Sequence, residues 1–548
     1  MGLAHLNRRQ PLIPLLWADV PDPSVIRVDG PDGRPLYYMS STTMHLAPGI
    51  PIMKSRDLVH WEIVNYVYDR LADDDRLALR DGKNAYGQGT WASSLRYNNG
   101  LYYLVTFSYT TGKTYIYRTA DPEKGRWAWV TLDKVYHDPS LLFDDDGRVY
   151  LVYGSGDISV VELSAEVDAV KEGGLHQVII PAAGRIAGTS FYVPAEGAHI
   201  HKVNGKYYIF LIAWPREGCG PYAMRTQLVY RADRINGPYE GRVILREAGI
   251  AQGGLVDTPD GEWYAMLFQD HGAVGRIPYL LPVNWKDGWP VLVTADPGGA
   301  ENRPEPAGLV GAWGLPSGIV AADEFDQDEL KLVWQWNHNP DHRYWSLRAR
   351  PGYLRLINGR LATGFLDAVN TLTQRTFGPE CSARVAVETG GMKPGDLAGL
   401  GLLQKNYGFV GVSCTRTPAA GDAKYLVMVD GSCDPPKERA RIPITQERVY
   451  LRIDIDYKNR ADKAYFFASL DGRKWQAVGE PLSMSYTIPH FMGYRFALFN
   501  YATEEPGGFV DFDYFRIEPC VQDKGFGFRG FQGFERAAFC EKEWRKEG

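Results

Sequence analysis

Short stretches in which apolar and polar residues alternate recur along the whole chain, with turn residues between them. Residues 449–457, for example, alternate as on a strand with one buried face, and 383–387 and 425–429 have the same character. The chain also holds 59 glycines, 35 prolines and 13% aromatic residues. This combination favours β structure with many tight turns over a helical bundle, so we expect an all-β protein.

One pattern repeats five times within the first 300 residues. Each copy has a lead residue, a short apolar strand, a turn containing glycine and an aromatic-rich strand. In four copies the lead residue comes nine positions before the turn glycine, and in the first copy a longer turn makes this eleven. The lead residues are Asp22, Trp91, Asp138, Glu196 and Gln252.

The turns of this repeat are Asn-Gly or Asp-Gly pairs, which are typical of hairpins with type I′ turns. Successive lead residues are between 47 (Trp91 to Asp138) and 69 (Asp22 to Trp91) positions apart, about the length of a four-stranded blade. We therefore predict a five-bladed β-propeller whose first strands are innermost. The five lead residues would then surround its axis.

The repeat stops near residue 300, where the chain becomes rich in proline, glycine and alanine. Beyond this stretch, alternating strands and a further hairpin at Asp471-Gly472 predict a β-sandwich. We expect a propeller over 1–305, a linker over 306–322, and a sandwich of the jelly-roll, concanavalin-like type with a C-terminal tail over 323–548.

The composition of the chain limits the classes of partner that it is expected to bind. The chain has 548 residues and a formal net charge of -6, which gives no basic footprint for nucleic acid. No apolar run approaches the roughly 20 residues of a membrane span. The N-terminal stretch lacks a small-residue cleavage site, so no signal peptide is visible and a cytoplasmic location is favoured. The sequence leaves open whether copies associate into a homo-oligomer.

Three of the five lead residues are acids, namely Asp22, Asp138 and Glu196. Hydrolysis of a glycosidic bond needs one carboxyl group to protonate the leaving oxygen and another as base or nucleophile. A third acid would raise the pKa of the proton donor by like-charge repulsion. The aromatic ring of Trp91 suits stacking against a sugar. The repeat therefore predicts a glycosidase site on an oligosaccharide substrate.

Several stretches resemble the family 43 glycoside hydrolases, especially their β-xylosidase and α-L-arabinofuranosidase group. The matching stretches are 20–27, 54–61, 137–141, 195–199, 275–276, 285–290 and 511–515. The resemblance implies that Asp22 is the general base and Glu196 the general acid. It also implies that Asp138 tunes the pKa of Glu196 and orients it, and that hydrolysis inverts the anomeric centre.

The same resemblance suggests residues around the acids. Arg276 corresponds to a substrate-binding arginine, and Gln252 stands where the xylosidase pattern has a histidine. An aromatic residue from the sandwich is expected at the rim of the site, and Phe499, or else Phe496, is the candidate. Some relatives carry a calcium ion on the propeller axis with one histidine ligand, for which His271 is the candidate here.

The sequence thus predicts an inverting, exo-acting enzyme that releases D-xylose, L-arabinose or both from xylo-oligosaccharides and arabinoxylan fragments. No organic cofactor is expected. Two alternatives are a retaining fructosidase-type propeller hydrolase and a non-catalytic carbohydrate-binding propeller. Asp22 is preceded by Val-Pro instead of the Trp-x-Asn pattern of the first alternative, and the second predicts that an acid would be lost.

Overall fold

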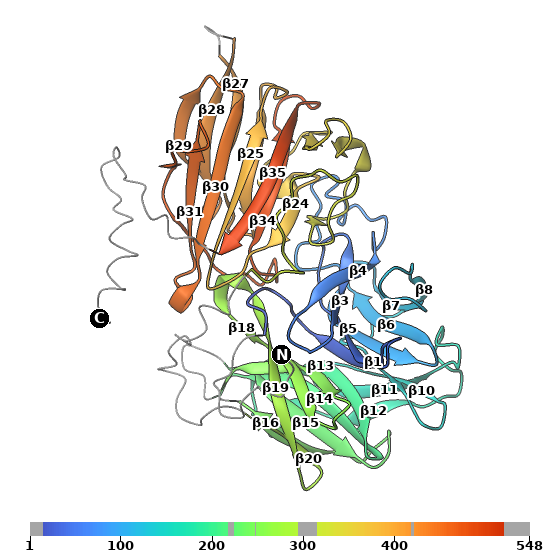
Figure 1. The fold of residues 1–548 in the computed structure, drawn as a ribbon. Helices are drawn as coiled ribbons and strands as arrows, with labels where there is room; N and C mark the ends of the chain where they lie inside the picture. Colours follow the sequence, from blue (N-terminus) through green and yellow to red (C-terminus); the bar gives the residue numbers. More distant parts are fainter. Residues whose placement is uncertain (1–14, 218–223, 247, 294–314, 418–420, 520–548) are drawn as a thin grey trace.

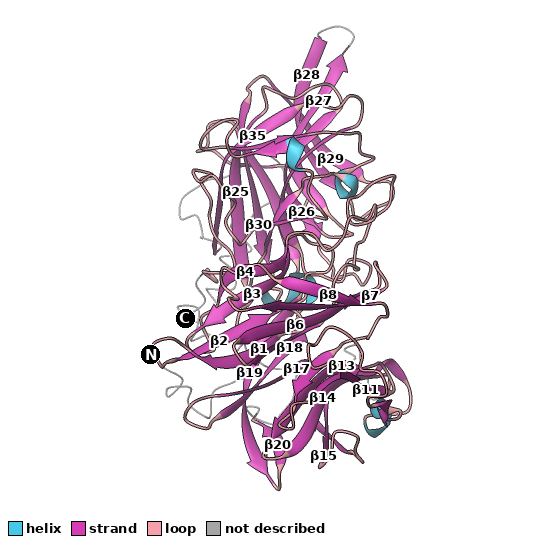
Figure 2. Cartoon of the chain, turned by 90° about the vertical axis from the view of Figure 1, so that its right-hand side faces the viewer, coloured by secondary structure: helices cyan, strands magenta, loops and turns pink. Residues whose placement is uncertain are grey.

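A computed structural model describes residues 15–217, 224–246, 248–293, 315–417 and 421–519. It shows two all-β domains, one above the other in Figures 1 and 2. Most of the predicted linker and the tail after residue 519 lie outside the described residues. The predicted all-β architecture is confirmed.

The N-terminal domain contains five four-stranded antiparallel sheets. The first is β1 (Ser24–Asp29), β2 (Pro35–Ser40), β3 (Gly49–Ser55) and β4 (Glu62–Tyr68). The second is β5 (Ser93–Asn98), β6 (Leu101–Ser108), β7 (Lys113–Thr119) and β8 (Ala128–Leu132). The third is β9 (Ser140–Phe143), β10 (Val149–Tyr153), β11 (Ile158–Leu163) and β12 (His176–Ile180). The fourth is β13 (Phe191–Val203), β14 (Lys206–Pro215), β15 (Thr226–Ala232) and β16 (Glu240–Leu245). The fifth is β17 (Ile250–Asp257), β18 (Trp263–Asp270), β19 (Arg276–Lys286) and β20 (Trp289–Leu292).

The first strands of the five sheets close into a ring. β1 contacts β5 and β17, β5 contacts β9, and β13 contacts both β9 and β17. The sheets are therefore the blades of a five-bladed propeller with the first strand of each innermost, as the repeat predicts. Each lead residue lies at or near the start of its innermost strand, or on it.

The hairpin turns of the repeat fall into two kinds. At Asn99-Gly100 and Asn204-Gly205 both residues have positive φ, as the predicted type I′ turn requires. At the three Asp-Gly turns only the glycine has positive φ, and at Gly147 the amide bonds back to the carbonyl of Asp144. The prediction of type I′ is wrong there, because these loops contain an additional residue and the glycine takes the left-handed position that follows the turn.

The C-terminal domain has two packed antiparallel sheets. The seven-stranded sheet runs β21 (Gln335–Trp336), β24 (Leu372–Arg375), β34 (Arg495–Ala502), β26 (Asp396–Leu403), β27 (Gly408–Thr417), β28 (Gly421–Asp430) and β29 (Lys437–Ile444). The other runs β22 (Trp345–Ser346), β23 (Leu354–Ile357), β35 (Phe509–Pro519), β25 (Glu380–Glu388), β30 (Arg448–Asp456), β31 (Lys463–Ser469) and β32 (Gln476–Ala477), and β33 (Leu482–Ser483) pairs with β31. Alternate residues of β25 and β34, such as Val385 and Leu498, share one core.

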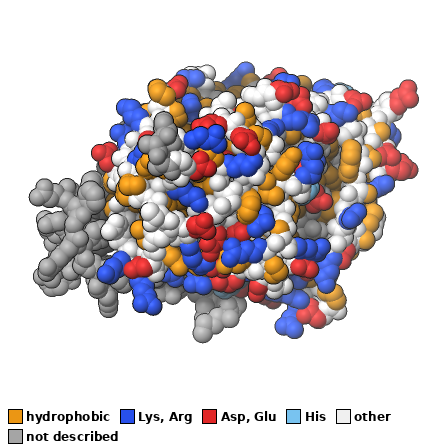
Figure 3. All heavy atoms as spheres, turned by 90° about the horizontal axis from the view of Figure 1, so that it is seen from above, with side chains coloured by type: hydrophobic (Ala, Val, Ile, Leu, Met, Phe, Trp, Pro, Cys, Tyr) orange, Lys and Arg blue, Asp and Glu red, His pale blue; other side chains and the backbone are white. Residues whose placement is uncertain are grey.

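Helices are confined to single 3-10 turns within the described residues. They span Ala183–Ile186, Gly272–Val274, His342–Tyr344, Phe365–Asp367 and Lys458–Arg460. On the end of the sandwich seen in Figure 3, acidic and basic side chains are interspersed. This face therefore carries no large field of one sign.

Backbone hydrogen bonds join the propeller to the sandwich. Ala47 and Trp336 exchange a pair of bonds of 2.6 and 3.0 Å, which forms a short antiparallel bridge between the domains. The amide of Tyr494 donates to the carbonyl of Ala273, and that of Gly493 donates to the carboxylate of Asp19. These bonds fix the segment 484–494 of the sandwich against the propeller end that carries the acids.

Candidate active site

The backbone is unusual at three of the five lead residues. Asp22, Asp138 and Gln252 have φ values of 51°, 46° and 62°, in the left-handed region that few side chains favour. Residues held in this region cluster at functional sites, because surrounding structure must compensate their strain. The propeller therefore aims these three side chains at a local energetic cost.

Asp22 forms an ion pair with Arg276, which begins β19. Arg276 Nη1 lies 3.0 and 3.2 Å from the two carboxylate oxygens of Asp22, and both side chains are buried. The backbone amide of Arg276 donates to Asp19 Oδ1 at 2.7 Å, which fixes the start of the strand. The predicted arginine is thus beside the acids, and it holds Asp22 in place.

Asp138 and Glu196 lie together on neighbouring blades. Asp138 Oδ2 accepts a 2.8 Å hydrogen bond from the amide of Gly197, the residue after Glu196. Gln252 is also adjacent, because a Cβ on Gly197 would come within 2.8 Å of its side chain. Burial raises the pKa of Asp138 to about 7, with added contributions from the charges of Glu196 and Asp22. The structure thus places the lead residues Asp22, Asp138, Glu196 and Gln252 together at one end of the axis.

His137 also contacts this group, and sequence reasoning gave it no role. Its Nε2 lies 3.0 Å from Glu196 Oε2 and 3.6 Å from Asp138 Oδ2, while Nδ1 lies 2.9 Å from the hydroxyl of Tyr109. Burial alone would raise the pKa of Glu196, but the hydrogen bond and charge of His137 outweigh it and lower that pKa. The sequence predicts a raised pKa for the proton donor, Glu196. In the free protein the opposite holds, because the pKa of Asp138 is raised and that of Glu196 is lowered.

Aromatic side chains border the acids. The Trp91 ring lies 5.5 Å from the ring of Tyr109 and 5.7 Å from that of Phe491, measured between centroids. Phe491 comes from the sandwich, its ring lies 4.5 Å from the guanidinium carbon of Arg276, and its carbonyl accepts from Arg276 Nη2. An aromatic residue of the sandwich therefore does reach the rim of the site, as expected, but it is Phe491.

The predictions for Phe499 and Phe496 are wrong. Both side chains are fully buried in the sandwich. Phe499 packs between Phe365 and Phe409, with ring centroids 4.9 and 4.8 Å away, and Phe496 belongs to the core between the sheets. The segment around Phe365 covers the face of β34 that Phe499 occupies, so neither face of this strand is free to reach the propeller.

His271 does not lie among the innermost strands. It follows β18, and its ring meets Trp17 edge-on with centroids 5.3 Å apart. Burial, together with the charge of Arg460 from the sandwich, lowers the pKa of His271 to about 4. The structure therefore contradicts its placement as an axial ligand and gives it a position at the domain interface.

The axis beneath the acids is occupied by Arg96 of β5. Its guanidinium donates to the carbonyls of Leu141 and Ile200 at 2.8 and 3.0 Å, so it reaches the innermost strands of two other blades. His199 and His201 lie beside it with pKa values lowered by burial and by the charge of Arg96. Calcium needs several oxygen ligands and usually carboxylates. A buried guanidinium and two neutral imidazoles do not fit this ion.

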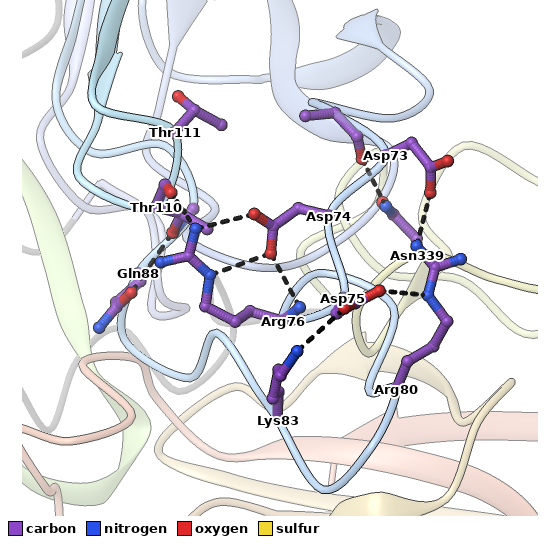
Figure 4. Close-up of polar contacts among 12 residues, drawn as sticks. Asp73, Asp74, Asp75, Arg76, Arg80, Lys83, Gln88, Thr110, Thr111 and Asn339 are labelled. Carbon is purple, nitrogen blue, oxygen red and sulfur yellow. Dashed lines mark hydrogen bonds and ion pairs between the residues drawn. The ribbon is translucent and has the colours of Figure 1, made fainter.

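Charged and polar side chains of the loop between β4 and β5, which leads to Trp91, form a network of hydrogen bonds and ion pairs (Figure 4). Arg76 donates to the carboxylate of Asp74 and to the carbonyl of Thr110, whose hydroxyl accepts from the amide of Gly89. Further along, Asp75 pairs with Arg80 and Lys83. A cavity of about 410 Å³ lies between this loop and the sandwich, and none of the five lead residues lines it. The charged network thus positions the loop that leads to Trp91.

Taken together, a five-bladed propeller with three carboxyl groups at one end of its axis and an aromatic rim defines a glycoside hydrolase. The match to known families is specific. Residues 11–290 match the model "Glycosyl hydrolases family 43", and residues 322–518 match the "Beta xylosidase C-terminal Concanavalin A-like domain". The chain belongs to glycoside hydrolase family 43, and it is an inverting glycosidase, as that family is.

Similar proteins support this assignment. The chain is 29% identical to a β-xylosidase of Formosa agariphila over 92% of this chain and 90% of that protein. It is 30% identical to a non-reducing end α-L-arabinofuranosidase of Bacteroides ovatus over 65% and 66% of the two chains. A solved structure, the "Bifunctional GH43-CE" of Bacteroides eggerthii, is 53% identical with a TM-score of 0.86. The similarity covers 94% of this chain but spans only 64% of that one.

These matches favour neither the retaining fructosidase-type hydrolase nor the non-catalytic propeller. A carbohydrate substrate follows from the family. No helix in the described ranges is long and apolar enough to cross a membrane. The cytoplasmic location and the association of copies stay predictions.

Proposed function

We propose that this enzyme removes single D-xylose or L-arabinose units from the non-reducing ends of xylo-oligosaccharides and arabinoxylan fragments. Asp22 is the general base, Glu196 the general acid, and Asp138 the residue that orients Glu196. The observation that carries these roles is the ion pair of Asp22 with Arg276. Of the three acids, all of them within the described residues, Asp22 alone pairs with an arginine.

The roles follow from the side chains that contact each acid. Arg276 pairs with the carboxylate of Asp22 and fixes its position, as suits a base that must be oriented toward the attacking water. Glu196 shares its cluster with Asp138 and His137, where a proton can be retained at neutral pH. In a single displacement, Asp22 takes a proton from the attacking water as Glu196 protonates the leaving oxygen.

The exo action is supported by the sandwich. Phe491 has a φ of 52° and packs against Trp91 and Arg276, so the rim is built from both domains. A Cβ on Gly87, four residues before Trp91, would come within 2.4 Å of the carbonyl of Pro489. This close packing leaves little space for a polymer to continue past the site, which suits removal of a terminal unit.

The choice of pentose rests on the relatives and on Gln252. The relatives named above are a β-xylosidase and an arabinofuranosidase, and D-xylopyranose and L-arabinofuranose present similar hydroxyl groups to one pocket. Gln252 is buried next to Gly197 and offers an amide that can donate to and accept from either sugar. We therefore infer activity on both.

Rates on 4-nitrophenyl β-D-xyloside and 4-nitrophenyl α-L-arabinofuranoside test the proposal. We expect Asp22→Asn to lower kcat about 10³-fold or more on both, because a general base contributes about 10²–10⁴. Asp29→Asn is the matched control, because Asp29 follows on the same blade with a side chain 88% exposed, and it should leave both rates unchanged. Turnover of Asp22→Asn within tenfold of the parent would contradict the proposal.

A further inference from the structure

His137 bridges two of the three acids, and its two ring nitrogens have different partners. Nε2 lies 3.0 Å from Glu196 Oε2 and 3.6 Å from Asp138 Oδ2. Nδ1 lies 2.9 Å from the hydroxyl of Tyr109. When Nδ1 donates to this hydroxyl, Nε2 is the nitrogen whose proton can be exchanged with Glu196. The side chain is only 15% exposed, so solvent does not compete strongly for that proton.

The charged groups around His137 are mostly negative. Asp138 and Glu196 contact it directly, and Asp22 adds to the negative charge at Asp138. The positive charge of Arg225, in the fourth blade, lowers the pKa of Glu196. Burial alone would lower the pKa of His137, but the two neighbouring carboxylates outweigh it and raise the pKa to about 9. At neutral pH the imidazole is therefore protonated and Glu196 is ionised.

This arrangement leaves the general acid without its own proton in the free enzyme. Glu196 must be protonated when the leaving oxygen departs, yet its pKa is lowered by the contact with His137. We propose that His137 is a positioning residue that stores the proton used by Glu196 and passes it across the Nε2–Oε2 hydrogen bond. The inference rests on the proposed role of Glu196 as general acid.

The proton balance closes over one turnover. As substrate enters, the Nε2–H bond breaks and an O–H bond forms at Glu196 Oε2, which leaves a neutral imidazole with its Nδ1–H on Tyr109. Glu196 then gives this proton to the glycosidic oxygen as the bond to the sugar breaks. Asp22 takes one proton from the attacking water. Afterwards Asp22 releases its proton to solvent, and His137 takes one up.

A series of leaving groups tests the proposal. His137→Gln keeps an amide donor near Glu196 but cannot store a proton. At pH 7.5 we expect its kcat on xylobiose, whose leaving oxygen must be protonated, to fall about 100-fold. On 2,4-dinitrophenyl β-xyloside, whose phenolate departs without a proton, kcat should fall less than about threefold. An equal loss on both substrates would overturn the proposal.

The pH profile gives a second readout. In the parent enzyme the cluster loses its proton as pH rises through about 9, so kcat on xylobiose should fall there. In His137→Gln the proton must reside on Glu196 itself, so this alkaline limb should move to lower pH and activity should recover on acidification. An alkaline limb that stays in place would also overturn the proposal.

Two further variants separate this role from a structural one. Ser155 donates to the same oxygen, Glu196 Oε2, at 3.0 Å but cannot store a proton. The alkaline limb reports the loss of the proton from His137, and Glu196 is ionised both before and after that loss. Ser155→Ala should therefore leave the alkaline limb at the same pH. Tyr109→Phe removes the partner of Nδ1 and should move the limb to lower pH. It serves as the test if His137→Gln fails to fold, and an unmoved limb in Tyr109→Phe would then contradict the proposal.

Failure of this inference is distinguishable from failure of the proposed function. If Asp22→Asn is inactive on every substrate while His137→Gln keeps the parent's leaving-group dependence, only the role of His137 is wrong. If Asp22→Asn remains active, the assignment of the acids fails regardless of His137.

Discussion

Histidine has one role at the end of the propeller axis that carries the acids, here called the mouth, and the opposite role in the layer beneath it. At the mouth, His137 lies between the carboxylates of Asp138 and Glu196, and its pKa is raised to about 9. Deeper on the axis, His199 lies beside Arg96, and burial with that positive charge lowers its pKa to about 3. The same side chain is thus a proton carrier in one layer and a neutral packing group in the next.

Arginine shows the same division. Arg276 at the mouth pairs with the carboxyl group of Asp22, whereas the described partners of Arg96 are carbonyl oxygens and the hydroxyl of Ser140. One guanidinium orients a carboxyl group of the site, and the other ties three innermost strands together. We therefore expect substitutions at the mouth to affect the rate and substitutions deeper in the axis to affect stability.

The largest expected effect is at the mouth. Arg276→Ala removes the partner of Asp22 and the contact that holds Phe491. We expect kcat to fall about 10³-fold on aryl xylosides, because the base loses the contact that orients it. Steady-state kinetics measure this. A loss smaller than tenfold in a folded variant would show that Arg276 does not hold the base.

Deeper on the axis, Arg96→Met should act mainly on stability. It leaves the carbonyls of Leu141 and Ile200 without their donor, at a cost of about 1–3 kcal/mol for each buried group. We expect thermal unfolding at a temperature about 5 °C lower or more, with kcat at 25 °C within about fivefold of the parent. An unchanged unfolding temperature with a large loss of kcat would reverse the comparison.

The two phenylalanines of the sandwich give a smaller contrast of the same kind. Phe491→Ala opens the rim beside Trp91, so KM for xylobiose should rise about tenfold, equivalent to about 1.4 kcal/mol of binding. Phe499→Ala leaves a cavity between Phe365 and Phe409 and should destabilise the fold by about 3–5 kcal/mol without changing KM. Michaelis constants and denaturant unfolding of both variants distinguish these outcomes.

The smallest expected effect comes from a chelator. Because a guanidinium and neutral imidazoles occupy the axis, overnight dialysis against EDTA should change neither kcat nor the unfolding temperature. Addition of CaCl₂ afterwards should also have no effect. A reproducible loss that calcium restores would show that an ion is bound, at the axis or elsewhere.

The sequence predicts the propeller and the acids for one physical reason. The lead residues stand at a fixed distance before the turn glycines, and a blade repeats its strands in a constant order, so Asp22, Asp138 and Glu196 fall at equivalent places. Their positive φ values and their mutual contacts do not follow from spacing. The register shifts around Glu196 and Gln252 that help to aim these side chains arise only when the blades pack.

The residues that the sequence missed or misplaced depend on tertiary contacts. Alternation along β34 cannot show that the segment around Phe365 covers its second face, and this is why Phe499 is buried. Phe491 lies in a loop with no strand pattern, and its approach to Trp91 depends on the docking of the two domains. His137 directly precedes Asp138, which is the only sequence signal for it. The contact with Tyr109 spans 28 positions.

The most direct test of the function is the anomeric form of the first product. Proton NMR of 4-nitrophenyl β-D-xyloside hydrolysis in the first minutes should show α-D-xylose ahead of mutarotation, because one displacement by water activated at Asp22 inverts the centre. The same sample with Asp22→Asn should show no xylose signal on that timescale. β-D-xylose as the first product, or its release at the parent's rate by Asp22→Asn, would contradict the assignment of Asp22 as the base of an inverting enzyme.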